Sequence, residues 1–151
     1  MRLFLILLLL MTGGVVAADE LDAGAEDTKA LQGLWHAVEL QANGQVAPAE
    51  ATKAFQVEFK GERIVFNPAT EARKHTFAVN PSAKPKAMDL MADDGPKKGQ
   101  KLPCAIYKLE GDKLTICLDK EGTAGSRPTE FRTAAGDGFA MIVLERANVK
   151  K

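Results

Sequence analysis

The sequence has few of the residue types on which most catalytic and metal sites depend. Its 151 residues include two cysteines, two histidines and two serines, Ser82 and Ser126. Neither serine lies in the Gly-x-Ser-x-Gly turn that exposes the nucleophile of a serine hydrolase. No glycine-rich phosphate loop or dinucleotide-binding motif occurs, so no cofactor is predicted. These absences argue against catalysis, and we expect the protein not to be an enzyme.

An excess of charge of either sign is also missing. Lys and Arg together number 20, and Asp and Glu together number 20. A protein that holds nucleic acid needs basic residues to neutralise phosphates, so nucleic-acid binding is not predicted. Hydrophobic residues make up 46% and charged residues 26% of the chain, which are ordinary values for a globular protein. The composition therefore favours one compact domain.

The one long apolar run lies near the N-terminus, from Leu3 to Met11. It spans about nine residues, whereas a helix needs about 20 to cross a bilayer, so a stable membrane anchor is not predicted. Small residues follow and end at Ala17 and Ala18, which suits cleavage of a secretory signal peptide after either residue. We expect residues 1–18 to be removed and the mature protein to be extracytoplasmic, either periplasmic or secreted. An uncleaved anchor is the alternative.

After the leader, apolar and polar residues alternate, which is the pattern of strands with one buried face. Turn-forming pairs such as Asn-Gly and Gly-Asp separate these stretches. Residues 19–28 are expected to be a flexible arm, and 48–53 a helical turn. Nine strands are predicted, at residues 33–40, 54–60, 63–66, 74–79, 87–91, 102–109, 113–118, 129–133 and 139–146.

Eight or nine short antiparallel strands without a covering helix must bury their apolar faces against one another. Closing the sheet into a barrel achieves this and removes the exposed edges. We therefore predict an all-β antiparallel barrel over residues 29–148, with a two-sheet sandwich as the alternative. The first and last strands of a barrel are neighbours. Arg146 could then lie over the indole of Trp35 and close one end, or the two residues could be unrelated.

The cysteines and histidines are the main candidates for chemistry. Cys104 and Cys117 lie on two strands joined by a tight turn, and a two-residue turn places them on one face, which their neighbours indicate is the outer face. An exposed pair in a secreted protein favours a disulfide, whereas a bulge would separate the sulfur atoms. His36 and His75 are 39 residues apart in the sequence, so they are expected at the surface and no metal site is predicted.

Several segments resemble a known family. Gly33-x-Trp35 at the start of a strand, with Arg146 ending the last strand, resembles the signature of lipocalin-like (calycin) barrels. Four segments in order, at residues 31–38, 84–90, 106–118 and 127–131, resemble a planctomycete secreted domain family of unknown function. The resemblance covers about Leu31 to Arg146. It implies a lipocalin-like barrel in an exported protein, and it implies no reaction.

An eight-stranded barrel has an interior just wide enough for side chains or one small ligand. Large residues are predicted to line it: Phe55, Phe66, Phe77, Met88, Tyr107 and Phe131. They form either a site for a small apolar ligand or a filled core. In the second case the protein is a cell-envelope structural or interaction module that uses its outer face or the loops at 84–86 and 93–101. Arg127 is expected to bind an anion or to pair with Asp89. We expect a monomer.

Overall fold

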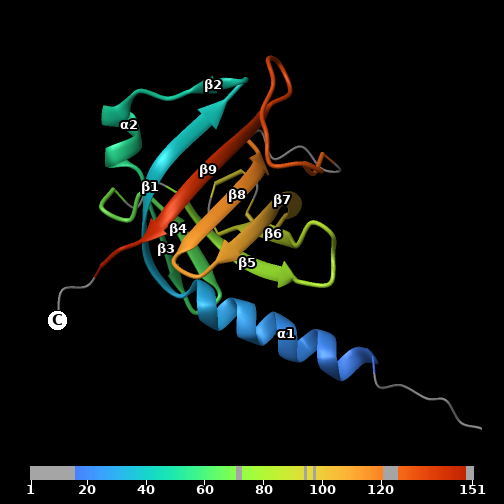
Figure 1. Ribbon diagram of the computed structural model, residues 1–151. Helices are drawn as coiled ribbons and strands as arrows, with labels where there is room; N and C mark the ends of the chain where they lie inside the picture. The colour runs from blue at the N-terminus through green and yellow to red at the C-terminus, as the bar shows by residue number, and fades with distance from the viewer. Residues whose placement is uncertain (1–15, 71–72, 94, 97, 121–125, 149–151) are drawn as a thin grey trace, which may run out of the picture.

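The structure is a computed structural model that describes residues 16–70, 73–93, 95–96, 98–120 and 126–148 (Figure 1). The chain is 49% strand and 14% helix. Its elements in order are α1 (Val16–Leu31), β1 (Gly33–Ala42), β2 (Gln45–Val46), α2 (Ala49–Ala54), β3 (Gln56–Lys60), β4 (Arg63–Phe66), β5 (Arg73–Asn80), β6 (Ala87–Ala92), β7 (Lys101–Glu110), β8 (Lys113–Asp119) and β9 (Phe139–Arg146).

The strands form one antiparallel sheet that closes on itself. Its order is β2-β1-β3-β4-β5-β6-β7-β8-β9, and β1 also pairs with β9. Eight strands therefore make a closed barrel, and β2 is an additional short strand. Figure 1 shows the contact of β1 with β9, which runs from Trp35 opposite Arg146 to Ala42 opposite Ala140. The prediction of an all-β barrel is confirmed, and the sandwich is wrong because the first and last strands are hydrogen-bonded to each other.

Eight of the nine predicted strands form close to their predicted bounds, and α2 forms where a helical turn is predicted. The prediction at 129–133 is wrong, because that segment has no regular structure. Its alternating side chains resemble a strand, but its polar groups bond within the segment, to β8 or to the turn after β1. Arg132 pairs with Glu130, the Arg132 carbonyl oxygen accepts from the Cys117 thiol, and Thr133 Oγ1 accepts a bond of 3.0 Å from the Gly44 N–H.

Residues 19–28 lie within α1 and do not form the irregular arm that the sequence predicts. The end of this helix packs against one end of the barrel, where Leu31 is fully buried (Figure 1). Just after the helix, the Gln32 side-chain amide exchanges two hydrogen bonds with the backbone of Gly61, of 2.9 and 2.7 Å. The last turns of the helix meet the barrel, and these tertiary contacts stabilise a helix that the apolar periodicity of the sequence does not indicate.

Arg146 closes the same end of the barrel. Its guanidinium carbon lies 4.3 Å from the centre of the Trp35 ring. Its two terminal nitrogens donate hydrogen bonds to the carbonyl oxygens of Gln32, at 2.8 Å, and Ala30, at 2.7 Å. Its Nε lies 3.0 Å from Asp112 Oδ1 in the β7–β8 turn. The placement of Arg146 over Trp35 is the one that the sequence suggests, and it joins α1, β1, β9 and that turn.

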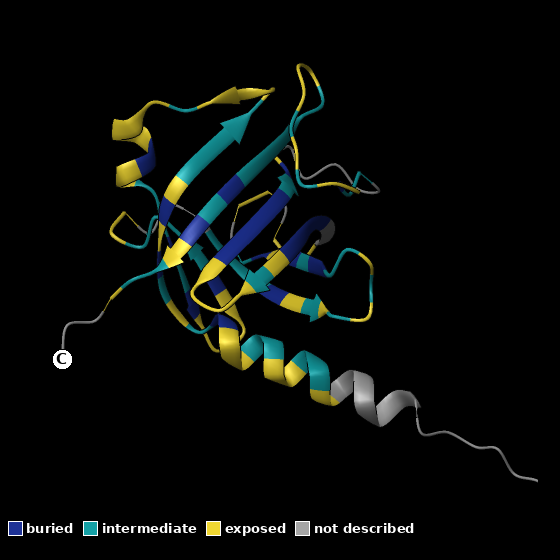
Figure 2. Cartoon of the chain, in the orientation of Figure 1, coloured by how far each residue is buried: buried dark blue, intermediate teal, exposed yellow. Residues whose placement is uncertain are grey.

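The barrel interior is a continuous cluster of buried side chains. Figure 2 shows in dark blue the buried positions along the strands. The rings of Phe59 and Phe77 meet edge to face with their centres 5.1 Å apart. The largest members are fully or almost fully buried: Leu31, Trp35, Phe59, Ile64, Phe77, Met88, Tyr107, Leu114, Ile116 and Leu144. Large side chains therefore occupy the half of the barrel that α1 and Arg146 close.

A second, smaller apolar layer lies outside the barrel, over β6, β7 and β8. Ala87, Ile106 and Cys117 are buried but do not belong to the inner cluster. The strand pairing aligns Ala87 with Ile106 and Ile106 with Cys117, so the three share one face. Pro128, which is also fully buried, directly precedes residues 129–133, which were predicted as a strand. That segment covers the outer face of the sheet and does not extend it.

Replacing Arg146 with Met should lower the free energy of unfolding by roughly 2 kcal/mol, because the cation–π contact and the charge-assisted hydrogen bonds are lost while the apolar stem is kept. Urea unfolding followed by tryptophan fluorescence measures this change. Arg63→Met is the matched control, since Arg63 is exposed and lies 3.7 Å from Asp93, and it should cost less than about 1 kcal/mol. Equal losses in the two variants would contradict the role of Arg146.

Replacing Phe77 with Ala should cost roughly 3 to 5 kcal/mol, because the change leaves a cavity in the inner cluster. Phe131→Ala is the comparison, since Phe131 lies outside the barrel and is only half-buried. It should cost clearly less in the same urea titration. A loss for Phe131→Ala as large as that for Phe77→Ala would show that Phe131 belongs to the core.

Candidate functional site

The structure separates the residues predicted to line a ligand site into three groups. Phe77, Met88 and Tyr107 are at most 5% exposed and belong to the inner cluster. Phe55 and Phe66 are half-buried and pack against that cluster, with ring centres 6.4 Å apart. Phe131 does not lie in the barrel wall, because its ring faces the Lys108 ammonium, 5.6 Å away, on the outer side of β7. Its predicted inward position depended on a strand that does not form.

Phe55 and Phe66 mark the end of the barrel opposite α1. Phe66 ends β4 and Phe55 directly precedes β3, whereas α1 packs near the β3–β4 turn at Gly61. The ring of His75 meets that of Phe66 edge to face, with centres 5.9 Å apart. These half-buried rings contrast with the fully buried side chains of the α1 end. This end of the barrel is called the open end below.

The two histidines do not come together. His36 is exposed on the face of β1 opposite to the buried Trp35, as the sequence predicts, and its Nδ1 lies 3.1 Å from the Gln56 amide nitrogen. His75 is half-buried beside Phe66 and is less exposed than the sequence predicts. Within the described ranges, no group of three or more His, Cys, Asp or Glu residues has the geometry to hold a metal ion.

Cys104 and Cys117 are free and buried, so the predicted exposed disulfide is wrong. Cys104 belongs to the inner cluster, whereas Cys117 lies in the outer layer, where its thiol donates to the Arg132 carbonyl oxygen at 3.6 Å. The β6–β7 pairing shifts between Met88 and Leu90, which marks a bulge beside Cys104. The sequence analysis considered a bulge in the β7–β8 hairpin instead, but that pairing is regular from Ala105 to Glu110 and the shift lies on the β6 side of β7.

Burial controls the chemistry of both thiols. Loss of hydration raises the pKa of Cys104 to about 11, partly offset by the nearby Arg127 guanidinium. Burial also raises the pKa of Cys117 to about 11, against a small lowering by its hydrogen bond to the Arg132 backbone. The thiolate is the nucleophilic form of cysteine, so neither residue is activated at neutral pH.

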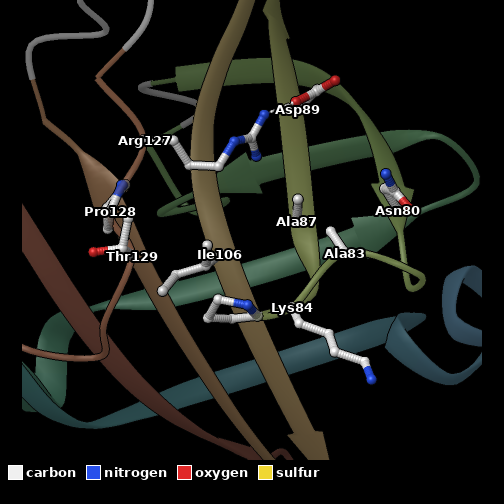
Figure 3. Close-up of a pocket in the computed structure, with 10 residues that line it drawn as sticks. Asn80, Ala83, Lys84, Ala87, Asp89, Ile106, Arg127, Pro128 and Thr129 are labelled. Carbon is white, nitrogen blue, oxygen red and sulfur yellow. Dashed lines mark hydrogen bonds and ion pairs between the residues drawn. The ribbon is translucent and has the colours of Figure 1, made fainter.

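A pocket of about 410 Å³ lies on the outer face of β6 and β7 (Figure 3). It is called the outer pocket below. Five of its ten lining residues are apolar and five are polar or charged. The lining comprises Asn80, Ala83, Lys84, Pro85, Ala87, Asp89, Ile106, Arg127, Pro128 and Thr129. Pockets that hold small ligands have this size, and they combine apolar surface with polar groups that orient the ligand.

Arg127 and Asp89 form one end of the outer pocket. The Arg127 Nη2 makes an ion pair with Asp89 Oδ1, and Figure 3 shows the two side chains directed toward each other. The Arg127 Nη1 also donates to the carbonyl oxygens of Met88, at 3.1 Å, and Ala105, at 2.6 Å. Those carbonyls flank the bulge between β6 and β7. Of the two expectations for Arg127, pairing with Asp89 is therefore the one observed.

The loop that carries Lys84 and Pro85 forms the opposite wall. The peptide bond between these residues is cis. The next residue, Lys86, donates from Nζ to Asp27 Oδ2 of α1 at 2.8 Å, and the Tyr107 hydroxyl donates to the same oxygen at 2.5 Å. Burial, followed by the bond to Asp27, raises the pKa of Tyr107, so the hydroxyl stays protonated as a donor. Helix α1 thus anchors the loop that bounds the pocket.

Sequence reasoning identified Arg127 and the 84–86 loop as features of interest but did not place them in one pocket. The remaining lining residues include alanines, prolines and Ile106, which carry no chemical signal in a sequence. One weak signal was present, because Pro85 and Pro128 lie in segments that the family resemblance also includes. Nothing in the sequence indicated that these two segments meet on the outside of the barrel.

The chain was compared with protein-family models, with curated proteins and with solved structures, and none of the three comparisons gave a match. In the part of the chain that the structure covers, no helix combines the length and the apolar character needed to cross a membrane.

In the folded protein at pH 8, Cys104 and Cys117 should react with a maleimide much more slowly than in urea, because burial and a pKa near 11 suppress the thiolate. Mass spectrometry of samples quenched over time measures the labelling. Labelling of the folded protein at the rate of the unfolded one would contradict this arrangement.

The raised pKa values of the two thiols also make the free energy of unfolding depend on pH in the alkaline range. Because both folded-state pKa values exceed the ordinary value of 9.0, the unfolded thiols ionise first. The stabilisation is therefore complete below about pH 9 and is lost as the pH rises through about 11. A Cys104→Ala, Cys117→Ala double variant should lose less stability than the wild type over this range.

Proposed function

We propose that this chain is an exported, lipocalin-like binding protein that takes a small and mainly apolar ligand in the outer pocket. The observation that carries the proposal is the pocket itself, a hollow of about 410 Å³ in which apolar residues, among them Ala87 and Ile106, share the lining with polar and charged ones. Export is supported by the apolar N-terminal run and the small residues that follow it, of which residues 1–15 lie outside the described residues.

The outer pocket is a better candidate than the closed half of the barrel. Phe77, Met88 and Tyr107, which the sequence analysis offers as ligand contacts, are each at most 5% exposed and pack within one cluster. A ligand there would have to displace side chains from a close-packed core, which is costly. The walls of the outer pocket, in contrast, are held in place by bonds that need no ligand. These are the Arg127–Asp89 pair and the Lys86–Asp27 contact.

The open end of the barrel is a second candidate site for an apolar ligand. Phe55 and Phe66 are half-buried there, and Leu40 and Leu118 are also only partly buried against the inner cluster. A small ligand could cover these side chains without displacing the core. This candidate keeps the ligand inside the barrel, as the sequence analysis expects. A cell-envelope interaction module that binds no small molecule is the alternative to both sites.

Methyl NMR spectra recorded during titration with benzyl alcohol should distinguish these functions, because the two candidate sites have different methyl groups. We expect shifts of Ala87 and Ile106, which line the outer pocket. Shifts confined to Leu40 and Leu118 would instead assign the ligand to the open end. If no methyl group shifts at millimolar benzyl alcohol, the interaction module is favoured and the binding proposal fails.

Ala87→Leu provides the matched variant, because three added carbon atoms would occupy the floor of the outer pocket. We expect at least a tenfold loss of benzyl alcohol affinity. Ala51→Leu, which makes the same change at an exposed position of α2, should bind as the wild type does. Unchanged affinity in Ala87→Leu, with folding verified by its urea midpoint, would show that the ligand lies elsewhere.

A further inference from the structure

We infer that the ligand of the outer pocket carries an acidic group and that Lys84 pairs with it at the rim. This inference rests on the proposed function, since it concerns the same pocket. It follows from the unequal charge of the two ends. Three of the lining residues are charged, namely Lys84, Asp89 and Arg127. Asp89 and Arg127 form an ion pair with each other, and Lys84 lies apart from them.

The Arg127 end of the pocket is electrostatically satisfied. The guanidinium is paired with Asp89 and also donates to two backbone carbonyl oxygens. An acidic group at this end would meet the Asp89 carboxylate and would have to compete with it for Arg127. Like charges at close range repel, so this end does not favour an anion. It favours an uncharged or apolar part of the ligand.

The Lys84 end carries the unmatched positive charge. Lys84 is exposed, and among the described residues it makes no ion pair. The nearest lysine in the sequence, Lys86, is already engaged with Asp27 at 2.8 Å and lies 5.9 Å from the centre of the Tyr107 ring. The lining residues therefore have a net charge of plus one, and that charge resides on Lys84.

The positions of the lining residues indicate how such a ligand would be oriented in the pocket. Figure 3 shows Ile106 and Ala87 at the floor, while the Lys84 side chain extends from the rim away from it. The long stem of a lysine moves its ammonium freely, so Lys84 can meet a group that protrudes from the pocket. An apolar body on the floor with one carboxylate at the rim would use both features.

The predicted contribution of this pair is modest. Exposed ion pairs of lysine with carboxylates change a binding constant by about twofold to fivefold. Salt screens such pairs, so the difference should shrink as the ionic strength rises from about 0.01 to 1 M. An apolar contact would not weaken in this way.

Three probes of the same shape and different charge test the inference: benzoate, benzyl alcohol and benzylammonium. Affinities for the full-length chain are measured by NMR titration at low ionic strength. We expect benzoate to bind about threefold more tightly than benzyl alcohol, and benzylammonium more weakly than both. Lys84→Gln should remove the preference for benzoate, so that benzoate and benzyl alcohol bind to this variant with equal affinity. Lys60→Gln, at an exposed lysine of β3, should alter none of the three.

The outcomes separate this inference from the proposed function. If benzyl alcohol binds in the outer pocket but benzoate binds no better, or if Lys84→Gln leaves benzoate unaffected, the acidic ligand is excluded and the pocket remains a binding site. If none of the probes shifts Ala87 or Ile106, the proposed function fails and the inference fails with it.

Discussion

The fold depends on the contact between the first and last strands, which Arg146 and Trp35 secure. An open sheet of eight short strands would leave two rows of unpaired backbone groups and expose one apolar face. Pairing of β1 with β9 removes both costs. The guanidinium of Arg146 then caps the closed end by covering the indole and binding carbonyl oxygens at the end of α1. The inner cluster exists only because this closure shields it from water.

A closed barrel makes its outer surface available for other uses. In this chain residues 126–138 lie over β6, β7 and β8 and help to bury Ile106 and Cys117, and Pro128 of this segment is itself buried. The cover is incomplete beside the loop of Lys84 and Pro85, and the outer pocket lies at this margin. The barrel acts as a rigid support, and the site is formed by two loops held against it.

Polar contacts hold those loops at both sides of the pocket. Arg127 joins the covering segment to Asp89 and to carbonyl oxygens beside the β6–β7 bulge. On the other side, Asp27 of α1 accepts hydrogen bonds from Lys86 and from the Tyr107 hydroxyl. The N-terminal helix is thus connected both to the closed end of the barrel and to the wall of the pocket. This arrangement links the stability of the fold to the shape of the candidate site.

The sequence by itself determined the eight strands of the barrel, because alternation of apolar and polar residues reports a local property, the two faces of a pleated strand. The absence of a covering helix then implied closure, and with it the meeting of Trp35 and Arg146. Only the tertiary structure decided which residues are buried on the outer face of the barrel strands. Cys117 has the pattern of an outward residue, yet the 126–138 segment covers it. Phe131 has the pattern of an inward residue, yet it lies outside. Both outcomes, and the pocket beside them, depend on contacts between residues distant in the chain, which local periodicity does not encode.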